Sequence, residues 1–200
     1  MKIPSESDLL QIQKFSPDLQ GVFKLSDLQI ILKSENLPTL YNRINRLVKA
    51  GVLKRFCKGV FTTENYSSEV LSSAINSDAY LSIGTVLAKE GLIGTVPEKR
   101  IMAVKPGRNR RYRRDDLVID HFGTSRKQYF GFSIVNGVKY ADCEKAYIDT
   151  LYYYMKGRRF SFNPASDVDV TRLDRRKVEK YLKQYKNSRF VKFCKGLLRG

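Results

Sequence analysis

Apolar residues recur with a helical period in the first part of the chain. The first predicted helix covers residues 7–15, and a loop follows it. The second predicted helix lies in the segment LSDLQIIL, where Ser26 and Gln29 have the spacing of a capping box. Leu25 and Ile30 stand at the two positions of a hydrophobic staple across this helix start. The pattern therefore predicts two short amphipathic helices in succession.

A third predicted helix runs from Pro38 to about Ala50, and Gly51 ends it. Its apolar positions fall at intervals of four, seven and eight residues and form one face: Leu40, Ile44, Leu47 and Val48. Two short apolar segments, 52–56 and 59–63, follow directly and predict a hairpin that turns near Lys58. A helical pair followed by a hairpin is typical of a winged helix-turn-helix.

The outer face of the third predicted helix carries side chains that are suited to DNA. Arginine recognises guanine or phosphate, and asparagine recognises the edge of adenine. The candidate recognition residues are Thr39, Tyr41, Asn42, Arg43, Asn45, Arg46 and Lys49. The candidate residues of the wing are Lys54, Arg55 and Lys58. The alternative interpretation is an ordinary helix and hairpin with solvated charges.

The rest of the chain predicts a second domain. Residues 1–66 form the predicted winged-helix domain, 67–77 a linker rich in serine and asparagine, and 78–200 the second domain. Within it we expect a helix in 80–94, strands at 99–106 and 115–122 around a basic loop, and a hairpin closed by Asn136 and Gly137. A helix capped by Asp142 and helices in 171–198 follow. The expected fold class is α+β, with a mixed α/β second domain of short antiparallel strands and C-terminal helices.

Composition narrows the choice of partner. The chain has 200 residues, 42% of them hydrophobic, and a formal net charge of +17. Such a charge indicates a partner that is nucleic acid, an anionic membrane or an acidic protein.

No apolar run approaches the ~20 residues that cross a bilayer, and the first residues lack the apolar stretch of a signal peptide, so we expect a soluble cytoplasmic protein without membrane contact. Three widely spaced cysteines do not match a zinc motif, and we expect neither metal nor cofactor.

The positive charge is concentrated in the second half of the chain. Residues 1–75 contain 10 basic and 7 acidic residues, whereas residues 76–200 contain 27 basic and 13 acidic residues. The densest predicted loop is a possible contact for nucleic acid or a protein partner and comprises Lys105, Arg108, Arg110, Arg111, Tyr112, Arg113 and Arg114. It could bind phosphate, with Tyr112 stacking on a base, or dock RNA or an acidic protein. A flexible charged loop is the third interpretation.

Two features of the sequence could indicate catalysis, a single histidine and a group of three acids, but each also has a structural explanation. His121 is the single histidine and stands at the end of a predicted strand, where structural histidines are common. Asp142, Glu144 and Asp149 could hold magnesium in a metal-dependent nuclease. However, Asp142 is explained as a helix cap, Glu144 as a favourable charge in the first turn, and Asp149 lies five residues beyond Glu144. We therefore assign no catalytic residue and expect no enzymatic activity.

The chain resembles the AbiEi-type antitoxin family of type IV toxin–antitoxin systems. In the first domain the resemblance rests on RINRLVKAGVLKRFCKGVF, which is similar to the third helix and wing of that family. In the second domain it rests on YLSIGTVLAKEGLIG and, after a pair of strands, on VKYADCEKAYIDTL. The ordered combination is more specific than either part. The arginine-rich segment at 108–114 and His121 have no counterpart in the motifs of the family.

The resemblance implies a DNA-binding repressor that is also an antitoxin. Members of the family bind inverted repeats in their own promoter and counter a nucleotidyltransferase-like toxin without a stable complex. The resemblance thus implies a monomer or weak dimer in solution and several copies on double-stranded DNA. Two alternatives remain: a nuclease targeted by the winged helix, and a pure toxin-binding module.

Overall fold

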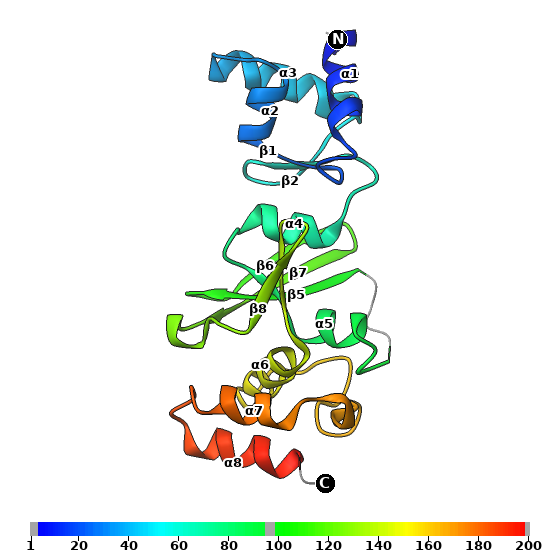
Figure 1. The fold of residues 1–200 in the computed structure, drawn as a ribbon. Coiled ribbons are helices and arrows are strands. Elements are labelled where there is room, and N and C mark those ends of the chain that lie inside the picture. The colour runs from blue at the N-terminus through cyan, green and yellow to red at the C-terminus, as the bar shows by residue number, and fades with distance from the viewer. Residues whose placement is uncertain (1–3, 95–98, 199–200) are drawn as a thin grey trace. The chain divides into compact units, whose positions relative to one another are not determined.

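A computed structural model describes residues 4–94 and 99–198 of the chain. Within these residues it contains eight α-helices and two β-sheets, so the fold belongs to the α+β class (Figure 1). The chain divides into two compact units, Met1–Ser77 and Asp78–Gly200. The boundary lies where the second domain was expected to begin.

The first unit contains a small sheet and four helices. Its elements are α1 (Glu6–Phe15), β1 (Val22–Lys24), α2 (Leu25–Ile31), α3 (Leu37–Lys49), β2 (Lys54–Cys57), β3 (Val60–Thr62) and α4 (Ser68–Ile75). The three strands are antiparallel in the order β1-β3-β2. Side chains from α1, α2, α3 and the sheet share one core, in which Phe23, Leu40, Ile44 and Phe61 are fully buried. The helical period and the hairpin predicted from the sequence are both present.

The start of α2 differs from the prediction. The strand β1 runs directly into α2, and Lys24 is the residue before the first turn. The Lys24 backbone N–H donates a 2.8 Å hydrogen bond to the carboxylate of Asp27, so Asp27 replaces the predicted pair of Ser26 and Gln29 at the helix start. The staple is also wrong, because Ile30 is 75% exposed. With Lys24 before the first turn, the staple positions fall on Phe23 and Leu28, which are both fully buried.

The segment expected to be a linker is largely helical. Ser67 caps α4 by accepting a hydrogen bond from the Val70 N–H, and Leu71 is fully buried. The helix packs against β1 and β3 of the first unit. The serine-rich composition led to the wrong prediction because four of these serines occupy a cap or lie within a helix: Ser67, Ser68, Ser72 and Ser73.

The second unit is built on a six-stranded mixed sheet. Its elements are β4 (Tyr80–Leu81), α5 (Gly84–Lys89), β5 (Arg100–Pro106), β6 (Arg110–Arg114), β7 (Leu117–Thr124), β8 (Phe132–Val135), β9 (Val138–Ala141), α6 (Cys143–Met155), α7 (Arg175–Leu182) and α8 (Ser188–Leu197). Short 3₁₀ turns lie at Arg126–Gln128 and Val170–Arg172. The strand order is β6-β7-β5-β4-β9-β8. The expected antiparallel strands occur in the pairs β4–β5, β6–β7 and β8–β9, but β5 and β7 are parallel, as are β4 and β9, and the sequence did not predict these two pairs.

Two local predictions in this unit also need correction. The basic segment expected to be a loop is the edge strand β6, which pairs antiparallel with β7 from Arg110 to Arg114. Alternating arginine side chains on a strand have no apolar period, so the pattern concealed the strand. The helix expected from residue 80 begins at Gly84, because Tyr80 and Leu81 form a central strand of the sheet.

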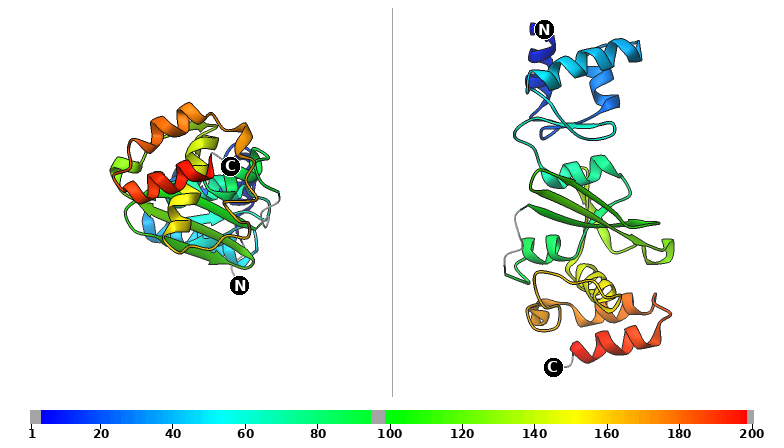
Figure 2. Two further views of the ribbon diagram at one scale, coloured as in Figure 1. Left: turned by 90° about the horizontal axis from the view of Figure 1, so that it is seen from below. Right: turned by 180° about the vertical axis from the view of Figure 1, so that it is seen from behind.

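Other predictions for the second unit are confirmed. Asn136 and Gly137 both have positive φ and close the β8–β9 hairpin, as the sequence predicted. Asp142 caps α6 by accepting a hydrogen bond from the Lys145 N–H. Helix α6 is almost entirely buried and contacts α5, α7 and α8. Figure 2 shows α7 and α8 side by side, and both lie on the side of α6 away from the sheet.

Candidate nucleic-acid interface

The outer face of α3 presents polar side chains to solvent. Asn36 caps the helix by accepting from the Thr39 N–H, and Pro38 lies in the first turn. Because the fully buried Leu40, Ile44 and Leu47 fix the rotation of the helix, the opposite face points outward. At the centre of that face lie Asn42, Asn45 and Lys49, all exposed. Thr39 and Tyr41 are exposed at its margins, and Arg46 is half-buried.

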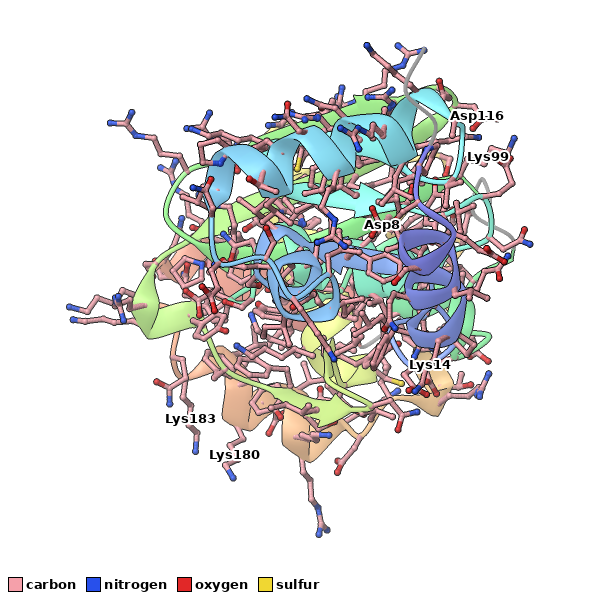
Figure 3. The ribbon with its side chains drawn as sticks, turned by 90° about the horizontal axis from the view of Figure 1, so that it is seen from above. Asp8, Lys14, Lys99, Asp116, Lys180 and Lys183 are labelled. Atoms are coloured by element: carbon pink, nitrogen blue, oxygen red, sulfur yellow. The ribbon has the colours of Figure 1, made fainter. Side chains whose placement is uncertain are left out.

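Arg43 does not belong to this outer face. Its guanidinium donates a 3.2 Å hydrogen bond from Nε and a shorter one from Nη2 to the Asp8 carboxylate, and Nη1 donates to the Leu32 carbonyl at 2.6 Å. Asp8 lies on α1, with a side chain that is only 3% exposed (Figure 3). Arg43 therefore ties α3 to α1 and α2, and its assignment to base recognition was wrong. A sequence cannot reveal this pair, because 35 residues separate the two charges.

The Arg43 pair also shifts the acidity of Asp8. Burial alone would raise the pKa of this carboxyl, but hydrogen bonds from Arg43 and Ser5 and the charge of Arg43 lower it below its ordinary value. The ion pair thus stabilises the unit above the ordinary pKa of an aspartate, and this stabilisation is lost as pH falls through the lowered pKa.

Replacing Arg43 with alanine is expected to lower the free energy of unfolding by about 1–3 kcal/mol, because the Asp8 carboxylate and the Leu32 carbonyl lose charged donors. Urea unfolding followed by circular dichroism measures this change. The matched control is Arg46→Ala, on the same helix. If the two variants unfold alike, the tethering role of Arg43 is wrong.

The β2–β3 hairpin places its three basic residues differently. Lys58 is exposed at the turn, whereas the Lys54 ammonium pairs with Glu64 at 2.5 Å. The guanidinium of Arg55 lies 5.1 Å from the centre of the Phe61 ring and is half-buried. Lys54 and Lys58 are thus both exposed, and Lys58 is the one that lies at the turn.

The β6 strand directs its arginines to both faces of the sheet. Arg110, Arg113 and Arg114 are exposed, and the Arg111 guanidinium donates to Asp120 at 2.5 Å and 3.3 Å. Asp120 also accepts from Arg100, so this carboxylate is shared between two arginines. Charged edge strands prevent the edge-to-edge association of sheets, which is a structural reason for this composition.

Two other residues of the predicted loop are turned into the unit. The Lys105 side chain donates to the carbonyls of Pro106 and Arg108, and the residue is only 8% exposed. Its assignment to a surface contact was therefore wrong. Tyr112 is half-buried and meets the His121 ring edge to face, with 5.4 Å between ring centres. Arg108 remains exposed.

A small hollow lies where this edge meets the loop before β6. Its volume is about 250 Å³, and Asn109, Arg110, Arg111 and Arg158 contribute to its lining. The loop is held close to β7: the Asn109 side chain accepts from the Gly123 N–H at 2.6 Å, and a Cβ on Gly123 would lie 2.0 Å from the Gly107 carbonyl oxygen. Glycine is thus required at 123 for the loop to approach.

The three carboxylates considered for a nuclease all have basic or hydroxyl partners. Asp142 accepts from the Tyr181 hydroxyl, and Glu144 pairs with Lys177 at 2.9 Å. Asp149 is buried with Lys145, as described below. Among residues 4–94 and 99–198, no group of three histidine, cysteine, aspartate or glutamate side chains is placed to hold a metal ion.

A buried polar network in the second unit was not predicted. Asp149 accepts hydrogen bonds from the Tyr80 and Ser82 hydroxyls at 2.9 Å and from the Lys145 ammonium at 2.5 Å. The same ammonium donates to the Tyr185 hydroxyl at 3.1 Å. Burial raises the pKa of Asp149, and the charge of Lys145 opposes that shift. The i,i+4 spacing of lysine and aspartate was the available signal, but it usually indicates an exposed pair.

A basic segment near the end of the chain was also overlooked in the sequence. Between Arg172 and Lys195 the sequence has ten basic and two acidic residues, more than in any predicted contact. The signal was present as a regular spacing of Lys and Arg at three or four residues, which places charges on one side of a helix. We call the exposed basic side of α7 and α8 the C-terminal basic face, with Arg176, Lys180, Lys183, Arg189, Lys192 and Lys195 as its members.

Comparison with known proteins identifies the fold class. No protein-family model matches the sequence, and no curated protein does. A solved structure, the crystal structure of the RV2827C protein from Mycobacterium tuberculosis, is similar over 99% of this chain and 78% of that chain. The TM-score is 0.62 and the sequence identity is 16%, so the similarity shows a shared α+β fold. None of the helices in the described part of the chain is both long and apolar enough to cross a membrane.

Proposed function

We propose that the first unit is a winged helix-turn-helix that binds double-stranded DNA, with α3 in the major groove and the β2–β3 hairpin beside it. The observation that carries the proposal is the outer face of α3, where Asn42, Asn45 and Lys49 are exposed on one side of a helix fixed by its buried side. Asparagine pairs with adenine edges, and lysine binds phosphate. Lys58 at the hairpin turn supplies a further phosphate contact.

We further propose that DNA binding represses transcription and that the protein is the antitoxin of a type IV toxin–antitoxin system. This step rests on the resemblance of RINRLVKAGVLKRFCKGVF and VKYADCEKAYIDTL to the AbiEi-type family. Two or more copies on inverted repeats would cover the promoter, and the second unit would counter a nucleotidyltransferase-like toxin. A gene for such a toxin beside this one would support the assignment, and its absence would count against it.

Single substitutions on α3 test the DNA-binding proposal. Asn42→Ala and Asn45→Ala are each expected to weaken binding to the DNA upstream of the gene by about 1–3 kcal/mol, because a bidentate base contact contributes that much discrimination. Binding to random duplex should change little, since phosphate contacts remain. Fluorescence anisotropy at fixed salt measures both affinities.

Lys14→Ala is the matched control for these substitutions. Lys14 lies on α1, away from the outer face of α3, and is exposed (Figure 3). We expect this variant to bind both duplexes with nearly the affinity of the wild type. Equal affinity of the wild type for upstream and random DNA would refute sequence-specific recognition.

A further inference from the structure

The C-terminal basic face is formed by two helices, and on each of them basic residues recur every three or four positions. On α7, Arg176, Lys180 and Lys183 recur at intervals of four and three residues, so their side chains lie in one row. The opposite side of α7 buries Val178 and Leu182. Figure 3 shows Lys180 and Lys183 projecting from the same side of this helix. The acids of the segment do not cancel the row, because Asp174 is used as the cap of α7 and Glu179 is a single charge.

Helix α8 repeats this arrangement. Its buried side carries Phe190 and Cys194, and its outer side carries the exposed Arg189, Lys192 and Lys195. Helices α7 and α8 lie side by side in both views (Figure 2), and each carries a row of three exposed cations. Six cations on two neighbouring helices repel one another unless an anionic partner covers them.

The outer side of α8 also holds an aromatic hollow. A depression of about 410 Å³ is lined by Arg189, Lys192, Phe193, Gly196 and Leu197. Gly196 leaves the floor open, since a Cβ there would meet no atom within 4 Å. The Phe193 ring is half-buried and nearly parallel to the Tyr154 ring, with an angle of 16° and 6.5 Å between ring centres. The Arg159 guanidinium lies 5.7 Å from the centre of the Tyr154 ring.

We propose that the C-terminal basic face binds single-stranded nucleic acid and seats an unpaired base on Phe193. Basic side chains that follow the backbone, combined with aromatic rings on which bases stack, are the chemistry of single-strand recognition. A base in a duplex is already stacked on both sides and so cannot stack on Phe193, whereas an unpaired base can. An acidic protein would use the lysines but would leave the aromatic hollow without a role, and an anionic lipid surface would bury Phe193 without stacking on its ring. This site belongs to the second unit, whereas the proposed DNA contact of α3 belongs to the first.

Tryptophan fluorescence tests the aromatic part of the proposal. The chain contains no tryptophan, so Phe193→Trp introduces a single fluorophore in the hollow. Addition of a 12-nucleotide oligouridine is expected to quench its emission, because a base stacks on the indole. The matched control is Ile134→Trp, at a side chain 65% exposed on β8. Quenching of the control alone, of both variants equally, or of neither overturns the proposal.

Charge variants test the backbone contact. The double variant Lys192→Gln with Lys195→Gln should bind oligouridine more weakly, and its slope of log affinity against log salt should be smaller by about 1.4, given about 0.7 per phosphate contact on a single strand. The matched control is Arg126→Gln with Lys127→Gln, two exposed cations of the same unit. Phe193→Leu, which keeps an apolar side chain, should weaken binding about 10-fold with an unchanged slope.

The same measurements separate this proposal from its competitors. Vesicles of phosphatidylserine and poly-glutamate serve as anionic probes without bases. If either binds as tightly as oligouridine and is equally sensitive to Phe193→Leu, base stacking is excluded and the proposal fails. Failure of the α3 variants to affect duplex binding would leave this result unchanged, because the oligouridine measurement does not involve α3.

Discussion

Replacing Asp149 with alanine is expected to lower the free energy of unfolding of the second unit by about 3–5 kcal/mol. The substitution leaves the Lys145 ammonium at a site where its side chain is 0% exposed, without the carboxylate that now lies 2.5 Å away. It also removes the acceptor of the Tyr80 and Ser82 hydroxyls. The rings of Phe130, Tyr80 and Tyr185 surround the ammonium at 4.7–5.8 Å, and they compensate only a part of the lost charge interaction.

Urea unfolding of the full chain measures this loss, and two further variants make the result specific. The double variant Lys145→Met with Asp149→Leu removes both charges and is expected to recover most of the stability. Asp116→Ala, which breaks the exposed pair with Lys99 in the same unit, should have little effect (Figure 3). A double variant as unstable as Asp149→Ala would show that packing, and not the unpaired charge, causes the loss.

The same network explains why the second unit was harder to predict than the first. In the first unit each helix has one apolar side, and the period of α3 places Leu40, Ile44 and Leu47 inside, as the structure confirms. Helix α6 lies between the sheet and α7–α8 and is buried on nearly all sides, so polar residues such as Lys145 and Thr150 also lie inside. Such a helix has no distinct polar side from which its orientation can be predicted. The residues that contact it come from distant segments of the chain.

The order of the strands in the sheet could not be predicted from the sequence either. The Asn136–Gly137 turn specifies a hairpin because both residues are adjacent in the chain and tolerate positive φ. The parallel pairs β5–β7 and β4–β9 join segments that are distant in the chain or separated by another strand, and no local rule selects them. For this reason the predicted antiparallel pairing is found in β8–β9, β6–β7 and β4–β5, whereas the two parallel pairs were not foreseen.

The candidate contact residues fall into two groups: those that the structure leaves exposed and those that it engages within the fold. Asn42, Asn45 and Lys49 were assigned to the outer face of α3 from its period and residue types, and they are exposed there. Arg43 was assigned to the same face and Lys105 to a basic loop, yet each is held by a partner that only the folded chain supplies, Asp8 and backbone carbonyls respectively. Residue type indicates what a side chain can bind, whereas the fold decides whether it is already bound.

Lowering the pH from 7.5 to 5 is expected to reduce the free energy of unfolding by about 2 kcal/mol through His121 alone. Burial, together with the charge of Lys105, lowers the pKa of His121 from its ordinary value of 6.5 to about 4, and Asp120 only partly opposes this shift. The native state therefore keeps the imidazole neutral, while the unfolded state takes up a proton below pH 6.5. The stabilisation is complete above pH 6.5 and is lost progressively as pH falls towards 4.

The composition of the chain allows the pH dependence between pH 5 and 7.5 to be assigned to one side chain. His121 is the single histidine, so no other side chain of ordinary pKa titrates between pH 5 and 7.5. Urea unfolding at several pH values should give a steeper decline for the wild type than for His121→Gln. The comparison of slopes remains valid even if the glutamine destabilises the unit at every pH, because a fixed loss does not change a slope. Parallel profiles for the two proteins would show that His121 is protonated equally in the native and unfolded states.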